Sequence, residues 1–394
     1  MRRLLKAYKV ELNPTSQQKQ KINQSIGVCR WLYNHYIAKN KQLYEAYQSG
    51  LISKHDAFIS ANSFDKYINN EVKVLDEYKW VNACGSKARK KSICNAETAY
   101  KRFFRGDSKF PRFKKKGKSH VGLYFPKNNK TDWKVERHRV NIPTLKWVRL
   151  KEYGYIPTKS NVISGTVTEK NGRYYVSIVC DVELQVKPKP KTQSIGIDLG
   201  LKDFASCSNH MTFKNINKTK QIKKLEKKLR REQRKLSKKF ENLKQRGGTA
   251  TRQNILKQKL KVAKLHEKLA NIRTDYVNKV VSQLIEQNPS SMTIEDLNVK
   301  GMMSNRHLSK AVAQQNFYEF RLKLTNKCKE KDIALRIVDR WYPSSKTCSC
   351  CGSIKSDLKL SDRTYKCHDC GMELDRDYNA SLNLKYATIY KLAY

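Results

Sequence analysis

Acidic residues are scarce in this chain of 394 residues. Aspartate and glutamate number 35, against 82 lysines and arginines, and the formal net charge is +47. A chain with so much charge of one sign repels itself unless a polyanion neutralises it. The excess therefore predicts nucleic acid as the partner. A membrane surface is the other anionic candidate, but the basic residues are spread from one end of the chain to the other.

Long apolar runs are missing too. No stretch approaches the roughly 18 apolar residues of a membrane-spanning helix, and no signal peptide is evident. We therefore expect a cytoplasmic protein with no membrane partner. A P-loop, a GxGxxG fingerprint and a nucleophilic triad are also absent, so the usual signatures of nucleotide binding and of a covalent nucleophile do not apply.

Cysteines are few outside one short segment. Five of the 11 lie between residues 348 and 370, and the other six are scattered singly, which suits a reducing compartment better than a disulfide framework. Two Cys-x2-Cys pairs in the segment, 15 residues apart, have the spacing of a zinc ribbon. Cys350 could replace a neighbour by a shift of register, and His368 is a poorer ligand. We expect Zn2+ to be held by four thiolates, those of Cys348, Cys351, Cys367 and Cys370.

Three carboxylates stand in short motifs spread over the C-terminal half. They are Asp198 in Gly-Ile-Asp-Leu-Gly, Glu295 in Thr-Ile-Glu-Asp-Leu, and Asp377 in Asp-Arg-Asp-Tyr-Asn-Ala. The first two lie on apolar, β-rich runs, where an unpaired buried acid is costly unless it coordinates something. Carboxylate oxygens suit Mg2+ or Mn2+, and phosphodiester hydrolysis by two metal ions needs such ligands. The three acids therefore predict a split two-metal nuclease site.

Each acid also has a plainer interpretation. Asp198 could be a surface residue at an ordinary strand turn, and Asp377 could simply cap the helix that follows it. Asp296 competes with Glu295 in the second motif, although alternation along a strand turns the two side chains to opposite faces. Asp375 competes with Asp377 in the third motif.

Hydrophobic patterning divides the chain near residue 190. A strand is expected at 4–12, then helices to about 104, then short strands separated by proline and glycine up to 185, of the kind that form a β-barrel or sandwich with the first strand. After a stiff basic linker at 186–191, the pattern becomes α/β. Heptad-spaced leucines and isoleucines interrupted at Gly247-Gly248 predict an antiparallel helical hairpin, for which a solvated charged arm is the alternative.

The order of these motifs resembles the transposon-encoded TnpB (OrfB) family. Besides the acids and cysteines, the likeness rests on Tyr-Pro-Ser-Ser-Lys-Thr-Cys before the first cysteine pair and on Tyr-Lys-Val-Glu-Leu-Asn-Pro-Thr near the start, so it covers nearly the whole chain. It implies a multidomain α+β protein: a β-barrel wedge domain carrying a helical recognition insert, then a RuvC, ribonuclease-H-like α/β nuclease core with a zinc-ribbon insert. The implied boundaries are 1–14 and 107–190 for the wedge, 15–106 for recognition, 191–341 and 372–394 for the nuclease (hairpin about 216–288), and 342–371 for the ribbon.

The resemblance also implies an activity, that of an RNA-guided DNA endonuclease related to the type V CRISPR effectors. A noncoding guide RNA and double-stranded target DNA would be the partners, in the cytoplasm of a prokaryote and on its nucleoid. The family's catalytic acids correspond to Asp198, Glu295 and Asp377. A guide-independent transposase or structure-specific nuclease, and a zinc-containing regulator of transposition that never cuts, are the alternatives. The chain can be a monomer or a dimer.

Clusters of basic residues mark where phosphates could bind. The flexible composition around Arg306, after Glu295, suggests a mobile lid over the nuclease site. Charge clustering is the basis for the other candidates. These are Lys87, Arg89, Lys90, Lys91, Arg102, Lys114, Lys115 and Lys116.

Overall fold

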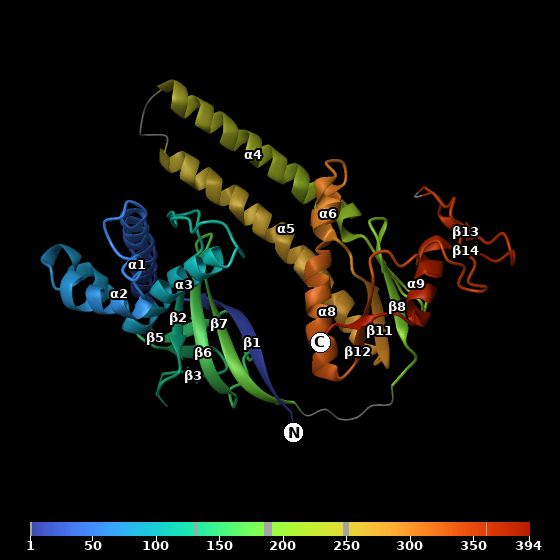
Figure 1. Cartoon of the computed structure of the whole chain (residues 1–394), viewed down its shortest axis with the longest axis horizontal. Coiled ribbons are helices and arrows are strands. Elements are labelled where there is room, and N and C mark those ends of the chain that lie inside the picture. Colours follow the sequence, from blue (N-terminus) through green and yellow to red (C-terminus); the bar gives the residue numbers. More distant parts are fainter. Residues whose placement is uncertain (1, 130–131, 185–190, 247–251, 360) are drawn as a thin grey trace. The chain divides into compact units, whose positions relative to one another are not determined.

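The computed structural model describes residues 2–129, 132–184, 191–246, 252–359 and 361–394. It divides into two compact units, residues 1–185 and 186–394, each with a hydrophobic core of its own. Figure 1 shows both. Most of the predicted basic linker, and the Gly247-Gly248 interruption, lie outside the described residues.

A seven-stranded sheet forms the base of the first unit, with the order β2-β6-β7-β1-β5-β4-β3. The first strand, β1, pairs antiparallel with β7 and β5 from much later in the chain, as the sequence predicted. The alternating burial of the strands fits one face against a core. The strands are β1 (Arg2–Asn13), β2 (Gly122–Pro126), β3 (Lys134–Val135), β4 (Arg139–Ile142), β5 (Lys146–Leu150), β6 (Asn161–Lys170) and β7 (Arg173–Leu184).

Helices of the first unit lie in sequence between β1 and β2. The longest, α1 (Ser16–Gln48), begins at Thr15, whose side chain forms a capping box with Gln18. Residues at helical spacing form its buried face, among them Ile22, Cys29 and Ile37. The others are α2 (Ala61–Tyr67), η1 (Ile68–Val72), η2 (Asp76–Ala83) and α3 (Ser86–Phe104).

The second unit is built on a six-stranded sheet with the order β10-β9-β8-β11-β12-β15. The central strands β8, β11 and β12 are parallel, and β9 and β15 are antiparallel to their neighbours. All these strands lie in the part of the chain that the sequence predicted to be α/β. They are β8 (Ile195–Leu199), β9 (Asp203–Cys207), β10 (Thr212–Lys214), β11 (Ser291–Glu295), β12 (Ala334–Val338) and β15 (Lys391–Leu392); β13 (Thr364–Lys366) and β14 (Glu373–Asp375) form a separate hairpin.

The predicted helical hairpin consists of α4 (Lys220–Arg246) and α5 (Arg252–Glu286), which lie side by side (Figure 1). Their contact is apolar, with Ile222, Leu229 and Leu269 buried. Asn316 adopts φ 57° and separates α7 (Ser309–Gln315) from α8 (Phe317–Lys331). The remaining elements are η3 (Ile216–Lys218), α6 (Val299–Ser304) and α9 (Arg376–Tyr386).

Both units thus mix helices with sheets, in agreement with the predicted α+β class. Among the helices of the described ranges, none is both long and apolar enough to cross a membrane.

Candidate functional site

The register of two parallel strands places Asp198 beside Glu295. On β11 and β8, Met292 pairs with Ile195 and Thr293 pairs with Gly196, so that paired residues are 97 positions apart in the sequence. The same register, continued by two residues, sets Glu295 opposite Asp198. Neighbours at the same register of a sheet have side chains on the same face. Both acids therefore come from the carboxyl ends of adjacent central strands, the edge at which α/β sheets usually bind their ligands.

Asp377 reaches the same edge because α9 packs unusually close to β8. A Cβ atom on Gly196 would lie 2.0 Å from the carbonyl oxygen of Ser381 and 2.4 Å from the backbone nitrogen of Lys385. Glycine is thus the residue that lets the helix backbone touch the strand. The helix N-terminus carries Asp377 in its first turn, and the N-cap is Asp375, which accepts from the backbone N–H groups of residues 377 and 378.

The electrostatics indicate that Asp198, Glu295 and Asp377 lie close together, with Asp375 as a weaker further neighbour. The pKa of Asp198 is raised well above its ordinary value by burial first, and then by the nearby charges of Glu295 and Asp377. Many protein atoms surround Asp198, although part of this residue is open to solvent. Burial also raises the pKa of Glu295. The hydroxyl of Ser344 donates to this carboxylate and offsets only part of the rise. Such a cluster of like charges is what a cation would stabilise.

The competing acids of the two motifs have other partners. Asp296 forms ion pairs with Arg321 and, at 3.9 Å, with Arg340. Asp375 is occupied as the cap of α9. Asp377 is itself paired with Arg376, with 3.2 Å between Nη2 and Oδ1. These contacts favour Asp198, Glu295 and Asp377 as the cation-binding set.

The three carboxylates are neighbours without forming a single tight coordination sphere. Within the described residues, one group of three or more potential ligands has all its ligand atoms within 4.8 Å, and it consists of cysteines. Acids that hold two metal ions, one on each side of a phosphate, need to stand further apart than the ligands of a single ion. Beside Glu295 lies a cavity of about 260 Å³, whose lining includes Tyr318 and the two arginines that pair with Asp296.

The cysteine group is the predicted set of four. Its Sγ atoms all lie within 4.8 Å of one another, with 3.6 Å between the sulfurs of Cys348 and Cys370 and between those of Cys351 and Cys367. Cys350 is exposed and His368 is outside the group, so neither competes. Four thiols converging in this way are the donor set of a structural zinc site.

Each cysteine pair is closed by the same turn. Gly352 and Gly371, which follow the second cysteine of each pair, have φ of +80° and +70° with open space around them. The left-handed conformation lets the chain turn back, so that the backbone N–H of Cys348 donates to Ser353 and that of Cys367 to Met372. The pKa of Cys367 is lowered to about 6, chiefly by the N–H of Cys370 and then by the Ser353 hydroxyl. A lowered pKa favours the thiolate that binds metal.

Two buried asparagines on α9, which sequence reasoning missed, connect the ribbon to the acids. Asn379 accepts from the backbone N–H of Ser349 and donates to the carbonyl of Thr347. Asn383, one turn later, donates to the carbonyls of Ser344 and Thr347. The visible signal was the i, i+4 spacing of two asparagines on an otherwise apolar helix face. The helix that carries Asp377 therefore also holds the segment that supplies Ser344 to Glu295.

The basic residues proposed for phosphate contact divide into two groups. Most are exposed, namely Lys87, Lys90, Lys91, Arg102, Lys115 and Lys116. Arg89 is only 7% exposed, and its Nε and Nη1 atoms have no hydrogen-bond partner among the described residues. Lys114 places its ammonium 4.0 Å from the ring centroid of Tyr33. Arg89 is thus largely covered by its own unit, and its contact with a phosphate stays a prediction.

A second basic surface, which the sequence-based list omitted, lies on α4. The exposed cations recur on one side of this helix while Ile222 and Leu229 face α5. Such an exposed cationic face could contact a polyanion, or it could face only solvent, as in the alternative of a solvated charged arm. The residues are Lys223, Lys224, Lys227, Lys228, Arg230, Arg231 and Arg234.

Family models match three parts of the chain. Residues 177–306 match a family described as "Probable transposase", and residues 317–384 match "Cas12f1-like, TNB domain". Residues 1–49 match a "Helix-turn-helix domain". In this chain that last segment folds as one strand followed by the 33-residue helix α1.

Similar proteins span most of the chain. "Putative RNA-guided DNA endonuclease InsQ" of Escherichia coli (strain K12) is 29% identical, over 96% of this chain and 91% of the relative. CRISPR-associated endodeoxyribonuclease Cas12f1 of Sulfoacidibacillus thermotolerans is 26% identical, over 57% of this chain and 52% of its own. Among solved structures, one titled "Cryo-EM structure of the Cas12f1-sgRNA-target DNA complex" matches with a TM-score of 0.57 and 14% identity, covering 99% of this chain and 100% of that one, so the fold is shared.

Proposed function

This chain belongs to the TnpB family, related to the type V CRISPR effectors, and on that premise we propose that it is an RNA-guided DNA endonuclease. The observation that carries the proposal is the meeting of three acids from distant segments at one edge of one sheet, where Glu295 and Asp377 raise the pKa of Asp198. A chain that only held DNA would gain nothing from this costly cluster.

Divalent cations fit this site. Carboxylate oxygens are hard ligands, which supports Mg2+ or Mn2+ on Asp198, Glu295 and Asp377. When bound, such ions lower the charge on the scissile phosphate and activate water. The chain's own residues then orient the acids: the Ser344 hydroxyl holds the carboxylate of Glu295, and Arg376 holds that of Asp377. Arg321 keeps Asp296 turned away from the cluster.

The cysteine ribbon fits zinc by the same reasoning. Four sulfurs within 4.8 Å and two glycine turns support Zn2+ on Cys348, Cys351, Cys367 and Cys370. We assign residues 342–371 to a nucleic-acid-binding insert of the nuclease and 372–394 to its last part, with 1–14 and 107–190 as the wedge around a recognition insert at 15–106.

Guide RNA and target DNA are the proposed partners. The net charge of +47 calls for a polyanion larger than one scissile phosphate. The exposed lysines of α3 and of the loop at 115–116 supply phosphate contacts in the first unit, and α4 supplies them in the second. Base pairing with the guide reads sequence, and the protein reads a short flanking motif. The protein acts in the cytoplasm, on the DNA of its host.

The test is reprogramming. The chain is coexpressed with the noncoding RNA of its locus, purified, and given Mg2+ and a double-stranded DNA that matches the spacer. Changing the spacer should redirect cleavage to the new match if the flanking motif is kept. Mismatches next to that motif should inhibit most, because pairing starts there.

Two controls separate the alternatives. Cleavage without RNA, or cleavage that ignores the spacer, would make the chain a guide-independent nuclease. Binding without any cleavage by the wild-type chain would make it a regulator. Light scattering of the assembled complex would decide between a monomer and a dimer.

A further inference from the structure

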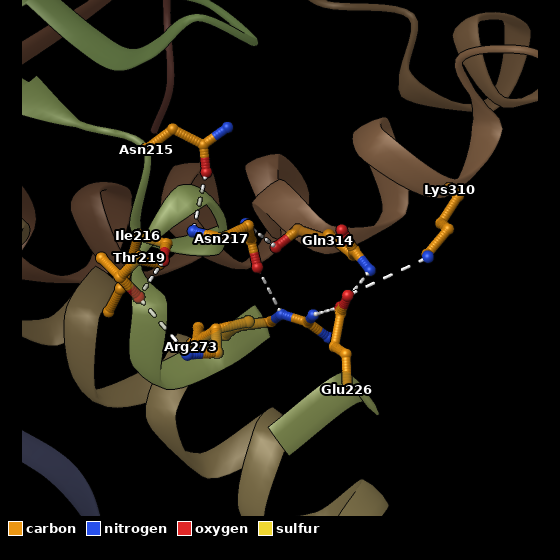
Figure 2. Close-up of polar contacts among 9 residues, drawn as sticks. Asn215, Ile216, Asn217, Thr219, Glu226, Arg273, Lys310 and Gln314 are labelled. Carbon is orange, nitrogen blue, oxygen red and sulfur yellow. Dashed lines mark hydrogen bonds and ion pairs between the residues drawn. The ribbon is translucent and has the colours of Figure 1, made fainter. Parts of the chain in front are cut away.

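A closed ring of polar contacts joins the base of the helical hairpin to the segments that flank the nuclease acids. Its centre is Glu226 on α4, whose side chain is 17% exposed. One carboxylate oxygen accepts from Arg273 on α5 at 3.0 Å and from Gln314 on α7 at 2.7 Å. Lys310, also on α7, lies 4.0 Å from the other oxygen. Figure 2 shows these groups converging on the carboxylate.

The ring continues from Arg273 to the turn behind Asp198. Arg273 donates from Nε to Asn217 at 2.7 Å, and the backbone N–H of Asn217 donates to the Asn215 side chain at 2.9 Å (Figure 2). Asn215 then donates to the carbonyl of Leu201 at 2.8 Å. Leu201 is two residues beyond the end of β8, the strand that carries Asp198.

The other half of the ring reaches the same turn through α7. Gln315, which is 3% exposed and follows Gln314, donates to the carbonyls of Gly200 at 3.3 Å and Leu201 at 3.5 Å. The Asn217 side chain also donates to the carbonyl of Gln314 at 3.1 Å, which braces the two halves. The ring therefore holds the turn directly after Asp198 together with α7, a helix that begins 14 residues after Glu295.

We infer that Glu226 is a positioning residue of the nuclease: it orients the turn after Asp198 and helix α7 so that the acids stand in their reactive arrangement. This inference rests on the proposed function. The side chain does not touch the reacting atoms. It acts through Arg273 and Gln314, and nearly buried polar networks of this kind tolerate the loss of one member poorly. A displacement of about 1 Å at a reacting centre can lower the rate about a hundredfold.

The chain offers a matched control in Glu232. This residue also lies on α4 and is nearly buried, and it accepts from Gln258 on α5 at 2.8 Å and from Lys235 at 3.3 Å. These partners belong to the hairpin alone. Glu226→Gln and Glu232→Gln therefore make the same change of charge in the same helix. Only the first removes the negative charge at the centre of the ring, so that the bonds from Arg273 and Gln314 lose their charge assistance and the ion pairs with Arg273 and Lys310 are lost.

The experiment compares both variants in complexes preloaded with guide RNA and target DNA and started by Mg2+. We expect Glu226→Gln to lower the single-turnover cleavage rate on the order of tenfold or more, with DNA affinity unchanged, and Glu232→Gln to cut at the wild-type rate. A double variant, Glu226→Gln with Gln314→Glu, exchanges the two side chains. One carboxylate then again faces one amide, and Arg273 donates to the oxygen of the new amide. It should recover most of the rate.

A second readout does not depend on cleavage. Amide hydrogen exchange over residues 299–316, measured in the full complex without divalent metal, should speed up in Glu226→Gln and stay unchanged in Glu232→Gln. Equal slowing of cleavage by both variants, no slowing by either, or unchanged exchange in Glu226→Gln would overturn the positioning role. If the wild-type chain does not cut at all, the proposed function fails, and the exchange measurement still decides whether Glu226 holds this segment.

Discussion

The close approach of α9 to β8 makes Gly196 a sensitive position of the proposed nuclease site. In Gly196→Ala, the new methyl group would lie 2.0 Å from the carbonyl oxygen of Ser381 and 3.0 Å from the carbonyl carbon of Leu384. Backbone atoms cannot rotate away as a side chain can. Since contacts of Cβ below 3.0 Å are essentially never found, the helix must shift by about 1 Å. Asp377, in the first turn of that helix, must move with it.

The size of the effect follows from two separate costs. Overpacking of this kind destabilises a core by about 1–3 kcal/mol, and a unit of this size loses about 2–4 °C of melting temperature per kcal/mol. A shift of about 1 Å at one metal-binding acid should lower the cleavage rate about a hundredfold. We therefore expect a folded, nucleic-acid-binding protein with a strongly reduced single-turnover rate.

The assay pairs calorimetry with single-turnover cleavage by preassembled complexes, and Gly165→Ala serves as the control. In that variant the methyl group would lie 2.2 Å from the side chain of Trp133, in the core of the first unit. It should lower the melting temperature, by less than Gly196→Ala if the tryptophan ring moves aside, and leave the cleavage rate of the assembled complex intact. Wild-type cleavage by Gly196→Ala, or equal slowing by both variants, would refute the argument.

Three further predictions concern the metals. Alanine in place of Asp198, Glu295 or Asp377 should abolish cleavage and leave RNA and DNA affinity nearly unchanged in a filter-binding assay, because each removes a cation ligand and no phosphate contact. Metal analysis should find about one zinc per chain, with Cys370→Ser losing the metal and Cys350→Ser, at an exposed position outside the cluster, keeping it. In the metal-free chain, the raised pKa values of Asp198 and Glu295 mean that the folded state binds protons more tightly than the unfolded state. Their contribution to stability, measured in chelator as the difference between the wild type and Asp198→Asn, should therefore fall as pH rises above about 4, the ordinary carboxyl pKa, and Mg2+ should weaken this dependence.

The strands and acids of the second unit were visible in the sequence because each is a local pattern. Asp198 and Glu295 interrupt apolar runs, and a charged residue inside such a run demands a partner. Cysteine spacing has the same local character. The preference for Glu295 over Asp296 also came from alternation along one strand, and it agrees with the ion pair of Asp296 with Arg321.

What the sequence left out depends on contacts between distant segments. Nothing near Gly196 indicates that residues 381 and 385 will press against it. Arg89 falls in a run of basic residues, yet it shares its helix face with Ala88, Ser92 and Ile93, which are buried. Glu226 resembles any acid of a charged helix until Arg273, Gln314 and Lys310 are brought to it from other elements. Asn316 ends a helix by adopting a left-handed conformation, which the residues around it in the sequence do not indicate.

The placement of Asp377 on α9 also has a consequence during synthesis. Asp377 follows Asp198 by 179 residues in the chain, and the helix that carries it packs on β8. A chain made from its N-terminus has β8 and β11 available long before α9 exists, and long-range contacts of this kind form late. On the proposed function, a growing polypeptide therefore carries an incomplete set of acids and should not hydrolyse the nucleic acid that its basic segments already attract. The order of the elements in the sequence therefore delays assembly of the proposed active site until α9 has packed on β8.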